Sequence, residues 1–193
     1  MSPPKEPKRR ALDRKERRLP SKIYLKRLIS KRGKKGLLYR KRIVHMRKVN
    51  RYAVALGKAL NKKGLKIDLG LVDCASLSHD LFKGSKTHES DATSFFKEKG
   101  YPDLATSILM ASPRAGLLFS SRLEDRFLAY ADSRFHLKDF MSLDERRKIM
   151  LVEGIPEKEK KVINAFFEEL KEFEKLLKAK AINPDKLIKA LNY

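Results

Sequence analysis

Histidine and aspartate residues offer the clearest chemistry in this sequence of 193 residues, which contains only four histidines. Asp80 directly follows His79, His45 precedes them by 33 intervening residues, and Asp132 comes later in an Ala-Asp pair. Imidazole nitrogens and carboxylate oxygens form a hard-to-borderline ligand set that suits Mn, Fe, Mg, Ni or Zn. Antiparallel helices around a common core can bring such side chains together from distant positions. Spacing alone leaves a second interpretation open, in which each of these residues makes only ordinary hydrogen bonds.

The His79-Asp80 pair is the most informative of these positions. It follows an apolar run over residues 69–77, which places it at the rim of the predicted core. A buried carboxylate beside an imidazole is costly unless it is paired or coordinates a cation. This cost favours the interpretation of His79 and Asp80 as metal ligands. In the structural alternative, Asp80 caps a turn and His79 hydrogen-bonds a backbone carbonyl.

The order of these residues resembles the HD-domain superfamily of metal-dependent phosphohydrolases. In that family a histidine opens a helix, a His-Asp pair stands in a Leu-His-Asp-Ile-Gly/Ala-Lys context, and a distal aspartate follows an alanine. Here residues 78–84 read Ser-His-Asp-Leu-Phe-Lys-Gly, and residues 100–102 read Gly-Tyr-Pro as in small stand-alone HD hydrolases. The resemblance covers residues 43–146.

The resemblance implies an all-α, single-domain, HD-type helical bundle that binds a divalent metal ion. The implied metal ligands are His45, His79, Asp80 and Asp132. A bound divalent cation lowers the pKa of its water toward neutrality and polarises a phosphoryl group. The family pattern also implies that Asp80 orients the nucleophile.

Several further residues are candidates for contact with substrate. Lys83, one turn after Asp80, is expected to offset phosphate charge in the transition state and is the second predicted catalytic residue. The alternative for Lys83 is an ordinary solvated surface lysine. The other predicted substrate contacts are His88, Arg114 and Arg134.

One departure from the family pattern concerns a second metal ion. Binuclear HD members supply another histidine on the helix after the residue that corresponds to His88, whereas residues 108–114 here contain none. We therefore expect one metal ion per chain and disfavour an HD-type oxygenase, which needs a di-iron site. His136 lies four residues beyond Asp132, but we expect it to be exposed to solvent.

Helical periodicity accounts for the elements that must position these residues. The sequence predicts a helix that Asp68 caps and that ends near residues 79–80, and further helices over residues 21–30, 42–61, 89–99, 102–111, 122–135, 142–151, 157–180 and 184–192, with no β-strand signal. His45 then falls in the first turn of its helix. One face of the 157–180 helix is apolar (Val162, Ala165, Phe166, Leu170, Phe173 and Leu177) and is expected to join the core, the alternative being a dimer surface.

Positive charge is concentrated at the N-terminus. The chain has 46 Lys and Arg against 24 Asp and Glu, and residues 1–51 hold 21 basic side chains against three acidic ones. We expect a basic, partly disordered arm over residues 1–41 and an all-helical domain over 42–193. Residues 1–51 are expected to attract a polyanion, with nucleic acid the first candidate and anionic lipid or an acidic protein the others. The alternative is a merely solvated tail.

Composition narrows the class of protein. No apolar run is long enough for a transmembrane helix, and no apolar segment follows the basic N-terminus as in a secretory signal. The lone Cys74 excludes an intramolecular disulfide and fits the cytoplasm.

We expect a phosphohydrolase acting on a nucleotide or related phosphate ester or phosphodiester through a metal-activated water. The alternative is a nucleic-acid-binding module on an HD scaffold with weak or no catalysis. The sequence does not predict the oligomeric state.

Overall fold

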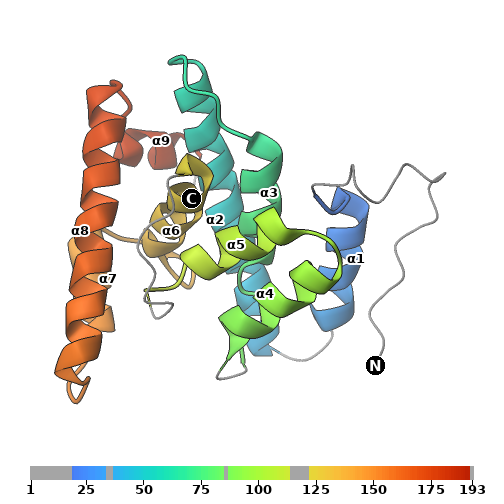
Figure 1. Cartoon of the computed structure of the whole chain (residues 1–193). Helices are drawn as coiled ribbons and strands as arrows, with labels where there is room; N and C mark the ends of the chain where they lie inside the picture. The colour runs from blue at the N-terminus through green and yellow to red at the C-terminus, as the bar shows by residue number, and fades with distance from the viewer. Residues whose placement is uncertain (1–18, 34–36, 85–86, 114–121, 192–193) are drawn as a thin grey trace.

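The computed structural model describes residues 19–33, 37–84, 87–113 and 122–191. These residues form a mostly helical single domain (Figure 1), which confirms the predicted fold class. The helices are α1 (Lys22–Gly33), α2 (Leu37–Asn61), α3 (Leu69–Ser78), α4 (His88–Glu98), α5 (Pro102–Met110), α6 (Leu123–Ser133), α7 (Leu143–Met150), α8 (Glu157–Ala179) and α9 (Pro184–Ala190). Two short strands, β1 (Phe135–His136) and β2 (Asp139–Phe140), pair antiparallel between α6 and α7.

Helices α2, α3 and α6 form the centre of the domain. In Figure 1, α7 and α8 lie on one side of this centre and α1 lies on the other. Helix α2 packs against both α3 and α6, so that the three helices that carry the predicted metal ligands are mutual neighbours. The fold therefore meets the first requirement for a site assembled from distant positions.

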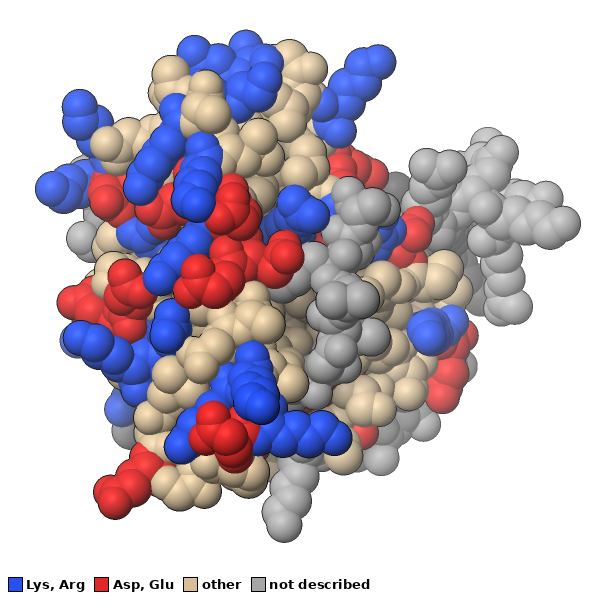
Figure 2. All heavy atoms as spheres, turned by 60° about the vertical axis from the view of Figure 1, so that its left-hand side comes forward, with Lys and Arg blue, Asp and Glu red and all other residues tan. Residues whose placement is uncertain are grey.

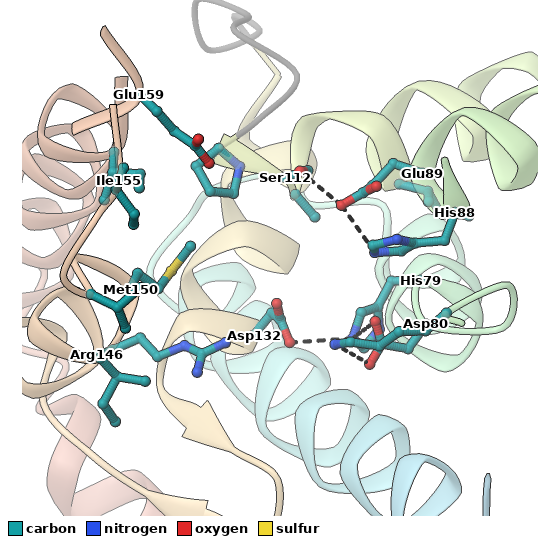
Figure 3. A pocket seen from close by; sticks show the side chains of 17 residues that line it. His79, Asp80, His88, Glu89, Ser112, Asp132, Arg146, Met150, Ile155 and Glu159 are labelled. Atoms are coloured by element: carbon teal, nitrogen blue, oxygen red, sulfur yellow. Dashed lines mark hydrogen bonds and ion pairs between the residues drawn. The ribbon is translucent and has the colours of Figure 1, made fainter. Parts of the chain in front are cut away.

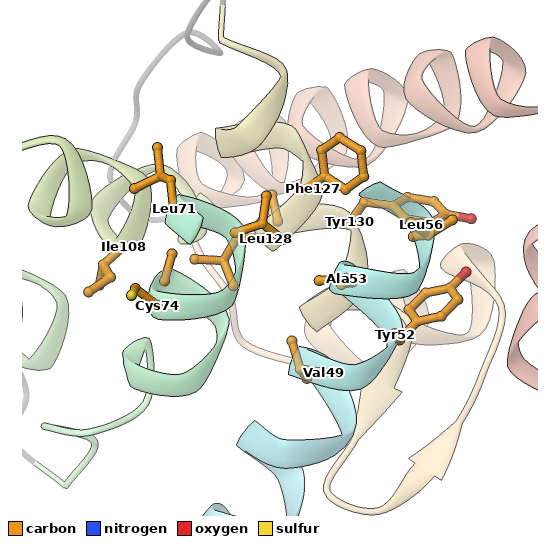
Figure 4. Packing of buried hydrophobic residues seen from close by; sticks show 14 of the residues in the cluster. Val49, Tyr52, Ala53, Leu56, Leu71, Cys74, Ile108, Phe127, Leu128 and Tyr130 are labelled. Atoms are coloured by element: carbon orange, nitrogen blue, oxygen red, sulfur yellow. The ribbon is translucent and has the colours of Figure 1, made fainter. Parts of the chain in front are cut away.

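One continuous apolar core holds these helices together (Figure 4). Val49, Tyr52 and Leu56 project from α2 at helical spacing, and Phe127 and Tyr130 come from α6. All five side chains are buried. Complete burial of one such side chain stabilises a fold by about 1.5–3 kcal/mol.

Polar caps fix where the helices begin. The Asp68 carboxylate accepts hydrogen bonds from the backbone N–H groups of Gly70 and Leu71 at the start of α3. Ser142 and Glu145 form a reciprocal capping box at the start of α7. Such caps satisfy N–H groups that have no partner inside a helix, and each is worth about 1 kcal/mol.

Helix α2 begins earlier than its sequence pattern predicts, at Leu37 rather than at residue 42. The segment between Gly36 and Gly57 contains neither glycine nor proline, so nothing stops the helix from extending toward its N-terminus. His45 consequently lies in the third turn of α2, and the prediction that it opens the helix is wrong.

The β1–β2 hairpin is the second difference from the predicted elements. Helix α6 ends at Ser133, and Phe135, predicted to be helical, lies in β1. The Phe135 ring packs edge-on against Tyr52 and Phe140, with centroid distances of 5.9 and 5.8 Å. This packing of aromatic rings competes with continuation of the helix. The turn between the strands places Leu137 at a φ of 55°, a conformation uncommon outside glycine.

The predicted arm and the folded body are not separated at residue 41. Helix α1 lies inside the predicted arm, yet Tyr24, Leu25 and Leu28 are buried in the common core. The helical core therefore begins before residue 42. Residues 1–18 of the predicted arm lie outside the described residues.

The apolar face of α8 belongs to the core, as predicted. Phe166, Leu170, Phe173 and Leu177 are buried. Ile163 and Phe167 complete this buried face, whereas Val162 is only partly buried and Ala165 is exposed. None of the helices among the described residues has the length and apolar character needed to cross a membrane.

Candidate metal centre

The four predicted ligands converge on one point. His45 comes from α2, His79 and Asp80 from the end of α3, and Asp132 from the last turn of α6. One ligand atom from each of His45, His79 and Asp80 can be chosen so that all three lie within 4.8 Å of one another. Asp132 Oδ1 lies 2.8 Å from His45 Nε2 and 3.2 Å from His79 Nε2. Residues up to 87 positions apart in the sequence therefore share one cluster.

The backbone after α3 presents the His-Asp pair. The His79 N–H donates to the carbonyl of Ala75, which is its helical partner, and the chain then turns sharply, with the Lys83 N–H donating to the carbonyl of Asp80. Gly84 closes this turn at a φ of +125°, a conformation that favours glycine. A Cβ at Gly84 would also lie only 3.3 Å from Arg42 Nη1. The glycine of the Lys-Gly pair thus has a geometric reason.

Both imidazole rings are held by backbone carbonyls. His45 Nδ1 lies 2.9 Å from the carbonyl oxygen of Leu137, and His79 Nδ1 lies 3.0 Å from that of Ser76. A carbonyl only accepts, so each Nδ1 carries a proton and donates it. The Nε2 atom of each ring then faces the carboxylates, and His45 Nε2 lies within hydrogen-bonding distance of Asp132 Oδ1, at 2.8 Å. Metal-binding histidines are oriented in this way, so the carbonyl hydrogen bond proposed as a structural alternative is compatible with a ligand role.

The cluster is not satisfied by its own hydrogen bonds. His79 Nε2 is buried and has no hydrogen-bond partner among the described residues. It lies 3.2 Å from Asp132 Oδ1 and 3.9 Å from Asp80 Oδ1, without the geometry of a hydrogen bond. A lone pair facing carboxylate oxygens in a buried site is unfavourable unless a proton or a cation lies between them.

The pKa values of the cluster reflect the same conflict. Burial disfavours the charged imidazolium, but the carboxylates of Asp80 and Asp132 outweigh burial and raise the pKa of His79. Burial likewise opposes ionisation of Asp132, yet His79 and His45 hold the pKa of its carboxyl well below its usual range. Both shifts favour positive charge at the centre of the cluster.

The residues present fit a divalent cation. Two imidazole nitrogens and two carboxylates form a ligand set of the type that Mn, Fe, Ni and Zn accept. His45, His79 and Asp80 are buried, and together they could hold a metal ion. Protonation of His79 competes with metal binding, because it also relieves the repulsion between His79 Nε2 and the carboxylate oxygens. It occurs only at a pH low enough for His79 to hold the proton.

The cluster lies at one wall of a cleft with a volume of about 390 Å³ (Figure 3). Two predicted substrate contacts line this cleft, Lys83 and His88. Lys83 Nζ lies 2.8 Å from Asp80 Oδ2, so the ammonium group is next to the cluster. His88 Nε2 lies 3.0 Å from Glu89 Oε1, which also accepts a hydrogen bond from Ser112. The structure therefore brings Lys83 and His88 to the same cavity as the predicted ligands.

The two predicted arginines are placed differently. The Arg134 guanidinium is buried in hydrogen bonds with Tyr130, Glu174 and Asp185 and does not line the cleft formed by the described residues. This placement favours a structural role over the predicted contact with substrate. Residues two apart on a helix do not share a face. The spacing between Asp132 and Arg134 therefore already indicates that the two side chains do not face the same cleft. Arg114 lies outside the described residues.

Four polar residues of the cleft were not predicted from the sequence: Glu89, Ser112, Arg146 and Glu159. The position of Glu89 directly after His88 was an available signal for the first. Nothing in the sequence distinguishes Arg146 from its neighbour Arg147, because only the packing of α7 decides which of the two faces the cleft. His136, expected to be exposed, is partly buried and accepts a hydrogen bond from Arg146. Burial and the nearby Arg146 cation lower the pKa of His136.

No protein family, curated protein or solved structure matches this chain. The resemblance to HD-domain phosphohydrolases therefore stays a prediction made from the motif. The cluster itself is described by the distances and burial of this chain's own residues.

Proposed function

We propose that this protein is a metal-dependent phosphohydrolase that acts on a nucleotide or a related phosphate ester or phosphodiester. One observation carries the proposal: His45, His79, Asp80 and Asp132 converge, and the last three line an open cleft. Buried ligand groups that also border a cavity can share a cation between protein and substrate, as catalytic sites do and closed structural sites do not. The ordered motif that resembles HD-domain enzymes supports the same function.

The cleft offers the groups that phosphate hydrolysis needs. A divalent cation, when bound, supplies Lewis-acid activation of the phosphoryl group and lowers the pKa of water. Lys83 contributes a positive charge beside Asp80 that offsets the charge of a bound phosphate. On the other side of the cluster, His88 and Glu89 present a hydrogen-bonded pair to the cleft, where they can contact the leaving group. We propose one cation per chain, because the described residues contain one such cluster.

Hydrolysis assays test this function directly. A panel of nucleoside mono-, di- and triphosphates, cyclic and linear phosphodiesters and simple phosphomonoesters is incubated with the protein and Mn²⁺. Wild type is compared with Asp80→Ala and with Asp144→Ala, whose exposed carboxylate pairs with Lys171 outside the cleft. We expect turnover of at least one class, loss of that turnover in Asp80→Ala, and normal turnover in Asp144→Ala. Equal background from wild type and Asp80→Ala on every substrate contradicts the proposal.

A second candidate function, nucleic-acid binding, is favoured by the charge of α1 and α2. No acidic residue occurs between Arg17 and Ile67, a stretch that contains both helices. On the α7–α8 side of the molecule, by contrast, basic and acidic side chains are interspersed (Figure 2) and pair within α8. A surface rich in cations binds the phosphates of nucleic acid, with an affinity that falls as salt rises.

Charge substitutions test this second function without removing the buried helix α1. The triple variant Lys26→Gln, Arg27→Gln, Arg47→Gln neutralises exposed cations of α1 and α2, and Lys175→Gln neutralises an exposed α8 lysine as the control. We expect the triple variant to bind a single-stranded RNA more weakly, with a log–log salt dependence that is shallower by about one for each phosphate that the protein no longer neutralises. Unchanged affinity in the triple variant contradicts the assignment of this surface.

A further inference from the structure

The cleft beside the predicted metal-binding cluster of His45, His79, Asp80 and Asp132, called the metal cluster below, has two chemically different walls. His79, Asp80 and Asp132 of the cluster form the polar wall together with Lys83 and His88. The opposite wall comes from α7, α8 and the segment between them, and Figure 3 shows Arg146, Met150 and Ile155 on this side. A volume of about 390 Å³ lies within the range of sites for small organic ligands. The residues of the α7–α8 wall are not motif residues, so the motif does not predict the chemistry of this wall.

Arg146 is the cation of this second wall. Its Nη1 donates a hydrogen bond of 2.8 Å to His136 Nδ1, which holds the guanidinium in the cleft. Its Nε is buried and has no hydrogen-bond partner among the described residues. The next residue, Arg147, turns away from the cleft and pairs with Glu168 of α8 at 3.1 Å.

A buried guanidinium donor without an acceptor is costly, and a bound anion removes that cost. Arginine presents its N–H groups in a planar fork that matches phosphate oxygens. Lys83 is already engaged with Asp80 at 2.8 Å, whereas among the described residues no carboxylate pairs with Arg146. Arg146 is therefore the cation of the cleft best able to take a new anionic partner.

Most of the α7–α8 wall beyond Arg146 is aliphatic, formed by Ile149, Met150, Val152, Ile155 and Ile163. The Glu159 carboxylate of α8 also lines the cleft on this side. Apolar side chains that border a polar subsite bind the carbon skeleton of a ligand and exclude water from it. An anion at Arg146 thus has an apolar surface directly beside it.

We propose that Arg146, positioned by His136, binds a phosphoryl oxygen of the substrate, whose organic group lies on the aliphatic wall of α7 and α8. The inference rests on the proposed phosphohydrolase function and narrows its substrate class. The cleft takes a small phosphate ester with a compact apolar organic group, and the phosphate is held between the metal cluster and Arg146.

Phosphate binding tests the role of Arg146 without knowledge of the substrate. Inorganic phosphate is titrated into the Mn²⁺-loaded protein by calorimetry, with Arg146→Ala compared against Arg147→Ala, the neighbouring arginine that faces away. We expect phosphate affinity to fall about tenfold or more in Arg146→Ala, since the hydrogen bonds it removes are charge-assisted, and to stay near that of wild type in Arg147→Ala. Equal phosphate affinity in wild type and Arg146→Ala overturns the proposal.

The positioning role of His136 has its own readout. In His136→Phe the acceptor for Arg146 is removed, and we expect phosphate affinity to fall about fivefold while Mn²⁺ affinity and thermal stability stay at wild-type values. Glutamine at this position restores an acceptor, so His136→Gln is expected to recover part of the phosphate affinity. Phosphate affinity that is unchanged in His136→Phe overturns the positioning role.

The aliphatic wall is tested with a series of alkyl phosphates, from methyl to hexyl, bound to the Mn²⁺-loaded protein. We expect affinity to rise with chain length in wild type and to rise less steeply in Ile155→Ser, because each buried methylene favours binding by a few-fold. Affinity that does not depend on chain length in wild type overturns this part of the proposal.

These outcomes are separable from the fate of the proposed function. If the metal-loaded protein binds phosphate through Arg146 but hydrolyses nothing, the subsite stands and the hydrolase proposal fails. If it hydrolyses an ester with the same KM in wild type and Arg146→Ala, the hydrolase proposal stands and the subsite fails. A wild type that neither binds phosphate nor hydrolyses any ester overturns both.

Discussion

Two buried polar clusters meet at the end of α6, and they are built in opposite ways. Arg134, two residues after Asp132, lies at the centre of the first cluster. Its guanidinium donates to the Tyr130 hydroxyl at 2.7 Å, to Glu174 at 2.9 Å and to Asp185. Its Nε donates to a backbone carbonyl at 2.9 Å, and the group stacks on the Phe140 ring at 4.4 Å. Each nitrogen of the Arg134 guanidinium therefore has a hydrogen-bond partner.

The cluster of His45, His79, Asp80 and Asp132 lacks such closure. His45 Nε2 lies 2.8 Å from Asp132 Oδ1 and Lys83 pairs with Asp80, but His79 Nε2 has no hydrogen-bond partner among the described residues. A buried charge whose hydrogen bonds close within the protein is part of the fold. A buried imidazole nitrogen that faces carboxylate oxygens without a hydrogen bond is relieved by a proton or by a bound cation. The two clusters thus differ in how completely their hydrogen bonds close.

Removal of Arg134 is expected to produce the largest loss of stability. Arg134→Ala removes the buried cation from Tyr130 and Glu174, and Glu174 keeps only its pair with Lys178. We expect the free energy of unfolding to fall by about 3 kcal/mol, toward the low end for a broken buried pair because Asp185 is largely exposed. Urea unfolding in the presence of a chelator measures this change. The control Arg147→Ala breaks a more exposed pair and is expected to cost less than about 1 kcal/mol. An Arg134→Ala protein as stable as wild type contradicts the structural role.

Addition of Mn²⁺ is expected to stabilise only a protein whose metal cluster is intact. Binding to the folded state alone adds about 2.7 kcal/mol at a Mn²⁺ concentration of 100 times Kd. We expect this gain in wild type and in Arg134→Ala, and its loss in His79→Gln, as measured by thermal unfolding with and without the ion. A gain that survives in His79→Gln places the metal ion elsewhere.

The gain from Mn²⁺ is expected to be larger at pH 8 than at pH 6. In the metal-free protein, His79 has a raised pKa. Its protonated form therefore stabilises the fold below the usual histidine pKa, and this contribution disappears as pH rises through the raised value. The metal ion competes with that proton, at a cost of about 1.4 kcal/mol per pH unit below the raised pKa. Equal thermal shifts at the two pH values show that no proton is displaced.

The smallest expected change tests the closure of the Arg134 cluster. Tyr130→Phe removes one hydroxyl, which accepts from Arg134 and donates to Glu174 at 2.9 Å. We expect a loss of about 1 kcal/mol in the free energy of unfolding, with the gain from Mn²⁺ unchanged. Urea unfolding of both proteins, each with and without Mn²⁺, measures the two quantities. A change in the Mn²⁺ gain means that the two clusters are coupled.

Helices with strong periodicity and clear caps were predictable from the sequence, and elements set by long-range packing were not. Asp68 and Ser142 marked the starts of α3 and α7 because they cap locally. The hairpin carries no glycine-based turn signal, since Leu137 adopts the left-handed conformation while its carbonyl accepts from His45. Such a turn depends on a partner 92 residues away.

The candidate site likewise contains some residues that could be predicted from the sequence and others that could not. The motif predicted His45, His79, Asp80 and Asp132, and these residues lie together in the structure. Arg134 was predicted to contact the substrate, although residues two apart on a helix, such as Asp132 and Arg134, point in different directions. Arg146 could not be chosen over Arg147 before the packing of α7 against α8 was known. Ligands within a motif are recognisable from sequence, whereas the opposite wall of a cleft is not.

The most direct test is the stoichiometry of metal binding. Equilibrium dialysis against Mn²⁺, with metal counted per chain, compares wild type with Asp80→Asn, which keeps the shape of the side chain and removes its charge. The cluster predicts one ion per chain in wild type and at least a tenfold weaker affinity, by about 1.4 kcal/mol per factor of ten, in the variant. A wild type that binds no ion, or an Asp80→Asn protein that binds it equally well, contradicts the assignment of this cluster as a metal centre.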